Sequence, residues 1–296
     1  MLGTSSAAPT RERNHVSAVL RWGHHKFAFD PGEGTQRQLL LADLSSYKLT
    51  HVCITHFHGD HCLGLSGIVQ RRALQHPPTP LVIYYPSWGQ AYIDRLLTGT
   101  EIDFDLQVEL VPVEPGDRIA VDPELELWCE ELEHSVPTVG WRLQAAPRRH
   151  LLPERLAALG ISGADIGRLR DEGSIEVAGR RVTFEEMSEV RPDASFAWVL
   201  DTRPCPGAER LAAGATMLVS ESTYLDDERE MAHDHGHTTA REAGELAARA
   251  GAGSLVLTHY SERYGDRHVL EAEARTAFPG AIAAEDLQRI PVPAAP

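Results

Sequence analysis

The chain contains 296 residues, of which 43 are acidic and 28 are lysine or arginine, so its formal net charge at pH 7 is −15. This acidity argues against a general nucleic-acid binder that relies on overall attraction to phosphate, so a polyanionic substrate would need local basic patches. The four cysteines lack the spacing of paired metal ligands, which predicts a reduced, cytoplasmic protein. No apolar run approaches membrane-spanning length, so we expect no membrane contact.

Apolar runs and amphipathic segments alternate along the chain in two halves, which predicts an α/β fold. In the first half we expect strands over 16–20, 26–29 and 52–55 and helices over 35–44 and 65–75. In the second half we expect strands over 197–201, 217–220 and 254–258 and a threonine-capped helix over 238–249. Between the halves, 145–191 contains two short helical pieces broken by glycines, which we interpret as an insertion. The tail over 291–296 is expected to be loosely held.

One short motif after the strand predicted over 52–55 combines three imidazoles with a carboxylate. It reads His56-Phe57-His58-Gly59-Asp60-His61. The first two histidines point the same way on an extended segment, and the glycine permits a turn that brings the last two side chains around. Imidazole and carboxylate suit zinc and similar divalent ions, and this mixture favours an open catalytic site over a closed structural one. The alternative is a solvated histidine-rich loop.

Three later residues each stand at the end of a predicted strand, namely His134, Asp201 and His259. Taken singly, each is a weak indication, because such residues are more often caps or satisfied core residues. Together with the first motif they supply seven ligands, which fit two ions bridged by a carboxylate and a hydroxide. A pair of metal ions in this arrangement is used to hydrolyse phosphate esters.

Five longer motifs narrow this interpretation. They are Asp30-Pro31-Gly32-Glu33-Gly34-Thr35-Gln36-Arg37-Gln38, Glu133-His134-Ser135-Val136-Pro137-Thr138-Val139-Gly140-Trp141-Arg142, Asp201-Thr202-Arg203-Pro204, His237-Thr238-Thr239-Ala240 and Leu257-Thr258-His259-Tyr260-Ser261-Glu262-Arg263-Tyr264. Over nearly the whole chain the sequence resembles the ribonuclease Z family of the metallo-β-lactamase superfamily. The resemblance implies a single αββα sandwich domain over 1–296 with a small inserted arm over 145–191. It also implies a zinc-dependent endoribonuclease that removes the 3′ trailer of precursor tRNA and leaves a 3′-hydroxyl.

The resemblance further implies two zinc ions per subunit, although other divalent ions suit the same ligands. One zinc would be held by His56, His58 and His134. The other would be held by Asp60, His61 and His259. Asp201 would bridge the two ions, and Asp60 would also orient the bridging hydroxide.

Two further residues receive catalytic roles by the same resemblance. His237 would protonate the departing oxygen, and Glu221 would hold the tautomer of this histidine. The alternative for His237 is an exposed polar loop, because two other histidines stand close to it in the sequence.

Substrate contacts are implied by the loop Pro9-Thr10-Arg11-Glu12-Arg13-Asn14, which resembles the family's loop for the acceptor end of tRNA. Arg11, Arg13 and Asn14 are therefore the candidate phosphate and base contacts. The alternative is an ordinary surface loop. In the family an arm grips the tRNA elbow, often from the partner subunit of a homodimer, but 145–191 lacks the Gly-Pro-rich signature of that arm.

Two other functions stay open at this point. The same scaffold suits a hydrolase of small phosphodiesters or lactones, for which an acidic chain is better adapted. A binding module that retains metals without turnover is the second alternative, although every candidate ligand and the candidate acid are present.

Overall fold

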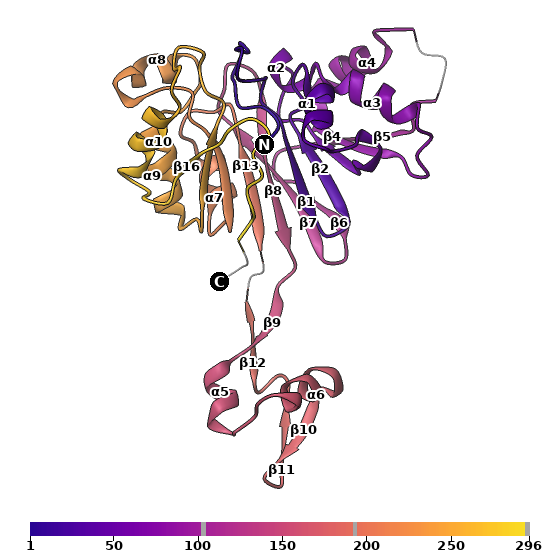
Figure 1. Cartoon of the computed structure of the whole chain (residues 1–296), viewed down its shortest axis with the longest axis vertical. Coiled ribbons are helices and arrows are strands. Elements are labelled where there is room, and N and C mark those ends of the chain that lie inside the picture. Colours follow the sequence, from indigo (N-terminus) through magenta and orange to yellow (C-terminus); the bar gives the residue numbers. More distant parts are fainter. Residues whose placement is uncertain (102–104, 192–193, 294–296) are drawn as a thin grey trace.

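The layers of the molecule follow the order helix, sheet, sheet, helix (Figure 1). The structure is a computed structural model and describes residues 1–101, 105–191 and 194–293. Two β-sheets pack face to face, and helices cover the outer face of each sheet. The predicted αββα sandwich is therefore confirmed. Within the described ranges, no helix has the length and apolar character that crossing a membrane requires.

The first sheet contains five strands in the order β1-β2-β3-β4-β5. They are β1 (Ala18–Trp22), β2 (His25–Phe29), β3 (His51–Cys53), β4 (Leu81–Pro86) and β5 (Val108–Val113). The first two form an antiparallel hairpin, and the other neighbours are parallel. The helices of this half are α1 (Thr35–Leu41), η1 (Ser46–Lys48), α2 (Gly59–Cys62), α3 (Leu65–Ala73), η2 (Ser87–Gly89) and α4 (Gln90–Thr98).

The second sheet contains seven strands in the order β16-β15-β14-β13-β8-β7-β6. They are β6 (Arg118–Asp122), β7 (Leu125–Leu132), β8 (Thr138–Ala145), β13 (Ser195–Val199), β14 (Met217–Glu221), β15 (Leu255–Thr258) and β16 (Ile282–Ala283). The strands from β13 to β16 run parallel, whereas β6, β7 and β8 pair antiparallel. The helices here are α7 (Pro206–Ala212), η3 (Asp226–Glu228), α8 (Arg229–Asp234), α9 (Ala240–Ala250) and α10 (His268–Arg275).

The two-residue period of the strands separates the cores of the sandwich. Phe29 and Trp198 project into the space between the sheets, where their ring centroids lie 5.3 Å apart. Their neighbours Ala28 and Val199 face outward, toward the helices of each half. Every strand residue of β13 is buried, because this central strand is covered on both faces.

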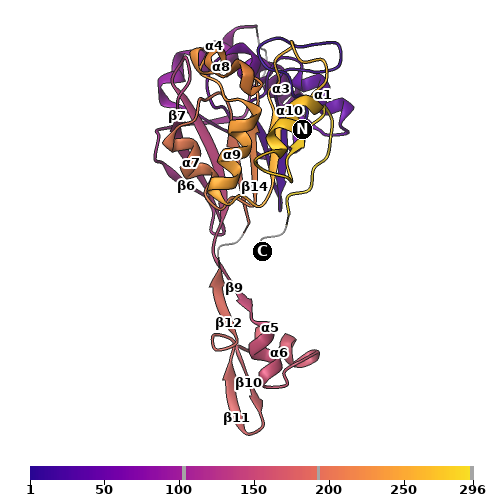
Figure 2. The same cartoon turned by 90° about the vertical axis from the view of Figure 1, so that its left-hand side faces the viewer.

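The segment between β8 and β13 extends away from the sandwich (Figures 1 and 2). The paired strands β9 (Arg148–Leu151) and β12 (Ser188–Arg191) form its stem. Beyond the stem lie α5 (Pro153–Ala158), α6 (Ala164–Glu172) and the hairpin of β10 (Ser174–Val177) and β11 (Arg180–Thr183). This segment has its own small core, formed by Leu156, Ile161, Leu169, Ile175, Val182 and Met187.

Most predicted elements are present with shifted ends. The threonine-capped helix begins at Ala240, because Thr239 forms a reciprocal capping box with Glu242. Thr238 instead donates a 2.6 Å hydrogen bond to a backbone carbonyl. The expectation of a loose tail is wrong for Val292, which packs against the core between the sheets. Residues 294–296 of that tail lie outside the described residues.

Gly207 at the start of α7 allows this helix to approach β7 closely. A Cβ atom at this position would lie 1.8 Å from the backbone oxygen of Glu131. We expect Gly207→Ala to lower the free energy of unfolding by about 1–3 kcal/mol, because the backbone must shift to relieve the clash. Urea denaturation followed by circular dichroism measures this change.

Gly167→Ala is the matched control, because this glycine lies in α6 and a Cβ atom there would contact nothing within 4 Å. Alanine favours a helix interior, so this variant should be at least as stable as the parent. Equal unfolding free energies for the two variants would contradict the proposed close approach.

Candidate metal centre

The seven side chains named as candidate ligands lie together at one end of the sandwich. Figure 1 shows α2 and α8 at this end, opposite the extended segment. His56 and His58 follow β3, and Asp60 and His61 lie in α2. The other three follow β7, β13 and β15, as His134, Asp201 and His259 respectively. Because parallel strands direct their carboxyl ends to the same edge of a sheet, residues distant in sequence converge here.

The first group contains three histidines and one carboxylate oxygen. His58 Nδ1 lies 3.0 Å from His56 Nε2 and 3.3 Å from His134 Nε2. Asp201 Oδ2 lies 3.7 Å from His56 Nε2 and 3.6 Å from His134 Nε2. A tetrahedral shell with bonds of about 2.0–2.1 Å places its ligand atoms about 3.4 Å apart, which agrees with these separations.

The second group contains Asp60, His61, His259 and the same Asp201. The Nε2 atoms of His61 and His259 lie 3.3 Å apart, and Asp60 Oδ2 is 3.5 Å from each. Asp201 Oδ2 is 3.3 Å from His61 Nε2, and Asp201 Oδ1 is 3.1 Å from His259 Nε2. Asp201 is thus common to both groups, and its Oδ2 lies within 3.7 Å of ligand atoms of each.

The chemistry of this donor set fits divalent cations. Asp201 is 2% exposed, and its Oδ1 accepts no hydrogen bond from any described residue. Burial lowers the pKa of His56 well below its usual range, an effect to which the neighbouring His61 adds. A neutral imidazole and an ionised carboxylate are the forms that bind metal, whereas burying them without a partner is costly.

Three residues without glycine's freedom adopt left-handed backbone conformations around the centre. Their φ values are 42° for Asp30, 51° for Asp201 and 62° for His259. Such conformations are strained for these residues and persist only where the surrounding structure imposes them. Each of the three follows a strand; Asp201 and His259 are candidate ligands, and Asp30 lies beside the ligand His61.

Hydrogen bonds to the second ring nitrogen fix the orientation of several histidines. His134 Nδ1 donates to the carbonyl oxygen of Gly236 over 2.9 Å, and His259 Nδ1 lies 2.9 Å from Thr223 Oγ1. His61 Nδ1 forms no hydrogen bond with any described residue, but it lies 3.2 Å from a carboxylate oxygen of Asp30. In each case Nε2 is left to face the centre, as metal-binding histidines require.

These supporting groups were not identified by the sequence analysis. Asp30 stands in a quoted motif, but nothing in its sequence position indicates that it meets His61. Its carboxylate also accepts hydrogen bonds from the Thr55 backbone N–H and from Trp198 Nε1, each over 2.8 Å. The buried Asp30 carboxylate therefore accepts hydrogen bonds from residues of both halves of the sandwich.

His237 lies beside the two ligand groups, with its ring centroid 4.9 Å from that of His134. Its Nδ1 lies 3.1 Å from Glu221, which is completely buried. Burial opposes protonation of His237, but the Glu221 carboxylate outweighs it and raises the pKa of this histidine to about 9. Glu221 also accepts hydrogen bonds from the backbone N–H of Thr202 and from the Thr223 hydroxyl, at 2.6 and 2.5 Å.

A cavity of about 660 Å³ opens over the centre. Its walls include His58, His134 and His237, together with the segment 6–8. Five of the seven candidate ligands line it, namely His58, Asp60, His134, Asp201 and His259, so the centre is accessible from this cavity.

The candidate substrate loop lies next to this cavity. The Arg13 guanidinium donates to the backbone carbonyls of Tyr264 and Ser261, at 2.8 and 3.2 Å. Asn14 Nδ2 donates to the Glu33 carbonyl over 2.7 Å. Arg11 is exposed. The structure thus uses Arg13 and Asn14 to hold the loop in place, and it leaves Arg11 directed to solvent.

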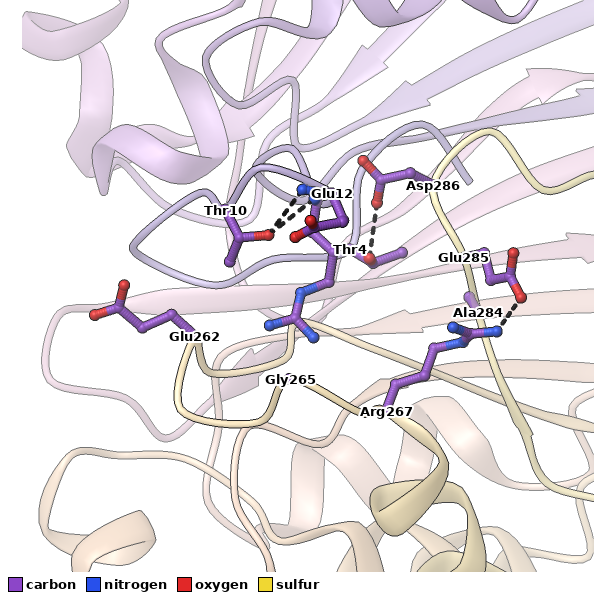
Figure 3. A pocket seen from close by; sticks show the side chains of 10 residues that line it. Thr4, Thr10, Glu12, Glu262, Gly265, Arg267, Ala284, Glu285 and Asp286 are labelled. Atoms are coloured by element: carbon purple, nitrogen blue, oxygen red, sulfur yellow. Dashed lines mark hydrogen bonds and ion pairs between the residues drawn. The ribbon is translucent and has the colours of Figure 1, made fainter.

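The same loop borders a second hollow of about 420 Å³ (Figure 3). Thr10 and Glu12 line it from the loop, and Glu262 and Arg267 line it from the other side. Arg267 is paired with Glu285, so its charge is partly neutralised.

The chain is similar to curated proteins over almost its whole length. It is 48% identical to ribonuclease Z of Nocardia farcinica, which covers 99% of this chain and 97% of that protein. It is 46% identical to ribonuclease Z of Streptomyces avermitilis with the same coverage. A family described as Anti-Pycsar protein Apyc1 matches residues 1–103.

Solved structures show the same relationship. Human tRNase Z, short form, superimposes with a TM-score of 0.67 at 25% identity and covers 98% of this chain and 97% of that one. The metallo-β-lactamase-fold protein YhfI of Bacillus subtilis has a TM-score of 0.69 at 17% identity, with 96% and 94% coverage, and this likeness concerns the fold alone. The chain has a metallo-β-lactamase fold, and its sequence is similar to ribonuclease Z proteins over almost its full length. It therefore belongs to the ribonuclease Z family.

Proposed function

We propose that this protein is the metal-dependent endoribonuclease that removes the 3′ trailer of precursor tRNA and leaves a 3′-hydroxyl. The observation that carries the proposal is the pair of ligand groups that share Asp201 and open onto one cavity. Full-length relatives named ribonuclease Z support the substrate class. A hydrolase specific for small phosphodiesters or lactones is not favoured, because that activity is not what these relatives are named for.

The centre would hold two divalent ions, which we propose to be zinc. The first ion would be bound by His56, His58 and His134. The second would be bound by Asp60, His61 and His259, with Asp201 shared between the two. Once bound, the ions would supply hydroxide at neutral pH and stabilise negative charge on the phosphate in the transition state.

The chain's own residues would then orient the reactants and move protons. The Asp60 carboxylate would accept a hydrogen bond from the attacking hydroxide and so orient the oxygen lone pair of the hydroxide toward phosphorus. His237 would donate its Nε2 proton to the departing 3′-oxygen of the tRNA, because its Nδ1 is occupied by Glu221. A buried carboxylate that keeps this imidazole protonated prepares it for that role.

We further propose that the chain is a single domain with an inserted arm over 145–191 and that it acts as a cytoplasmic homodimer. Arg11, Arg13 and Asn14 would contact the acceptor end, and the arm would contact the body of the tRNA. Two arginines of the arm already form ion pairs, Arg168 with Asp165 and Arg180 with Glu186. A phosphate would have to replace those exposed pairs, which are individually weak.

Asp201→Ala should remove the carboxylate common to both ligand groups. We expect it to lower metal content and cleavage activity together, because neither group would then be complete. Metal analysis of the purified protein, alongside cleavage of a 3′-extended precursor tRNA, measures both. Normal metal content with full activity would refute the shared role.

His237→Ala should leave both ligand groups intact and remove the proton donor. We expect unchanged metal content and a single-turnover cleavage rate that is about 10²- to 10⁴-fold lower, the usual contribution of general acid catalysis. A cleavage rate equal to that of the parent would eliminate this residue as the acid.

Glu221→Gln should shift the pH dependence of cleavage. The carboxylate raises the pKa of His237, so the acid form is present below that pKa and is lost as pH rises through it. Removing the negative charge lowers the pKa, and the alkaline limit of the rate profile should therefore move to lower pH. The measurement is the single-turnover rate across pH for parent and variant, and identical profiles would disprove the coupling.

A further inference from the structure

Three aromatic side chains form a partly exposed cluster beside the metal centre. The rings of Phe57 and Tyr92 are stacked, with centroids 5.5 Å apart and planes inclined by 22°. Trp88 meets both rings edge-on, with centroids 5.5 Å from Phe57 and 6.1 Å from Tyr92. Trp88 is 40% exposed and Tyr92 is 46% exposed. We call Phe57, Trp88 and Tyr92 the aromatic wall.

The fold builds this wall from two segments that meet behind the candidate ligands. Phe57 stands between two of them in the sequence, whereas Trp88 lies in η2 and Tyr92 lies in α4. Gly89 makes the contact possible, because a Cβ atom there would lie 1.9 Å from the Phe57 ring. The position of the wall relative to the centre is thus determined by close packing.

Two members of the wall, Phe57 and Tyr92, line a hollow next to the cavity over the centre. This hollow measures about 300 Å³ and shares Gly59 with the 660 Å³ cavity. On another side, the same cavity shares Glu262 with the hollow next to Arg13 that Figure 3 shows. Each outer hollow therefore shares a lining residue with the cavity over the metal centre, which is the middle one of the three.

The chemistry of the wall suits unpaired nucleobases. Exposed aromatic rings are the usual stacking platforms for single-stranded RNA. Arg95 adds a guanidinium 5.5 Å from the Tyr92 ring centroid, and it forms no ion pair with any described residue. Because the chain carries a net charge of −15, stacking also gives affinity for RNA without relying on overall charge attraction.

We propose that the aromatic wall binds the first unpaired nucleotides of the 3′ trailer by stacking on their bases. This assignment rests on the proposed function, because the direction of the strand follows from it. The acceptor end lies toward the Arg13 loop and His237, so that its 3′-oxygen meets the proton donor. The strand beyond the scissile phosphate then leaves on the side of Gly59, where the wall begins.

The test measures kcat/KM for two proteins on two substrates. The proteins are the parent and the double variant Trp88→Ala with Tyr92→Ala. The substrates are a normal precursor tRNA and one whose first two trailer nucleotides are abasic. With the parent, we expect removal of the bases to lower kcat/KM about tenfold or more, since stacking contributes about 1–3 kcal/mol per base. The double variant should show the same loss on the normal substrate and no further loss on the abasic one.

Two controls separate stacking from other effects. Trp88→Phe with Tyr92→Phe keeps the rings and should cleave the normal substrate at nearly the parent rate. Leu40→Ala removes another exposed apolar side chain, which lies on α1 and is 63% exposed. This variant should cleave each of the two substrates with the same kcat/KM as the parent. Sedimentation of each variant reports whether the association of the chain with itself changes.

The possible outcomes distinguish a failure of this inference from a failure of the proposed function on which it rests. Equal losses on the normal and the abasic substrate would overturn the inference, and if association also changed, the wall would be a contact between two copies of the chain. A parent that cleaves both substrates equally well would also overturn it while leaving the proposed function intact. A parent that leaves the normal precursor uncut in the presence of zinc would overturn the proposed function itself.

Discussion

The buried carboxylate of Asp201 is the group on which the rest of the centre depends. The ligand atoms around it come from three other segments, which follow β3, β7 and β15, and its Oδ2 lies close to members of both ligand groups. A carboxylate at 2% exposure is unfavourable without compensation. Its position is stable because it follows β13, a strand buried on both faces in the middle of the larger sheet. The shared carboxylate therefore follows the central strand of the larger sheet, and packing on both faces of that strand holds it in position.

Around this carboxylate, a second layer of hydrogen bonds links the two halves of the sandwich. Asp30 belongs to the first sheet, yet it accepts a hydrogen bond from Trp198 of the second. Glu221 joins the chain after Asp201 to His237 and, through Thr223, to His259. Because of these contacts, the geometry of the centre depends on how the two sheets pack against each other. A change in how the sheets pack would consequently disturb both ligand groups and the proton donor together.

An acidic protein that acts on RNA must attract the RNA through local contacts, because its net charge repels phosphate. The arginines nearest the centre are largely engaged, since Arg13 is bound to two backbone carbonyls and Arg267 is paired with Glu285. Divalent ions would supply positive charge where the phosphate sits, and aromatic rings would supply affinity that does not depend on charge. This division explains how a chain with a net charge of −15 is compatible with membership of a ribonuclease family.

The sequence by itself determined the alternation of strands and helices, the αββα fold by resemblance, and the motif from His56 to His61, because periodicity and ligand spacing are local properties. It also indicated His134, Asp201 and His259, but only as residues that follow strands. Tertiary structure alone decided that these residues meet, that Asp30 and Thr223 orient their histidines, and that Trp88 and Tyr92 stand beside Phe57. The reason is physical: left-handed turns after strands and contacts across two sheets depend on packing between residues far apart in sequence, which no local pattern records.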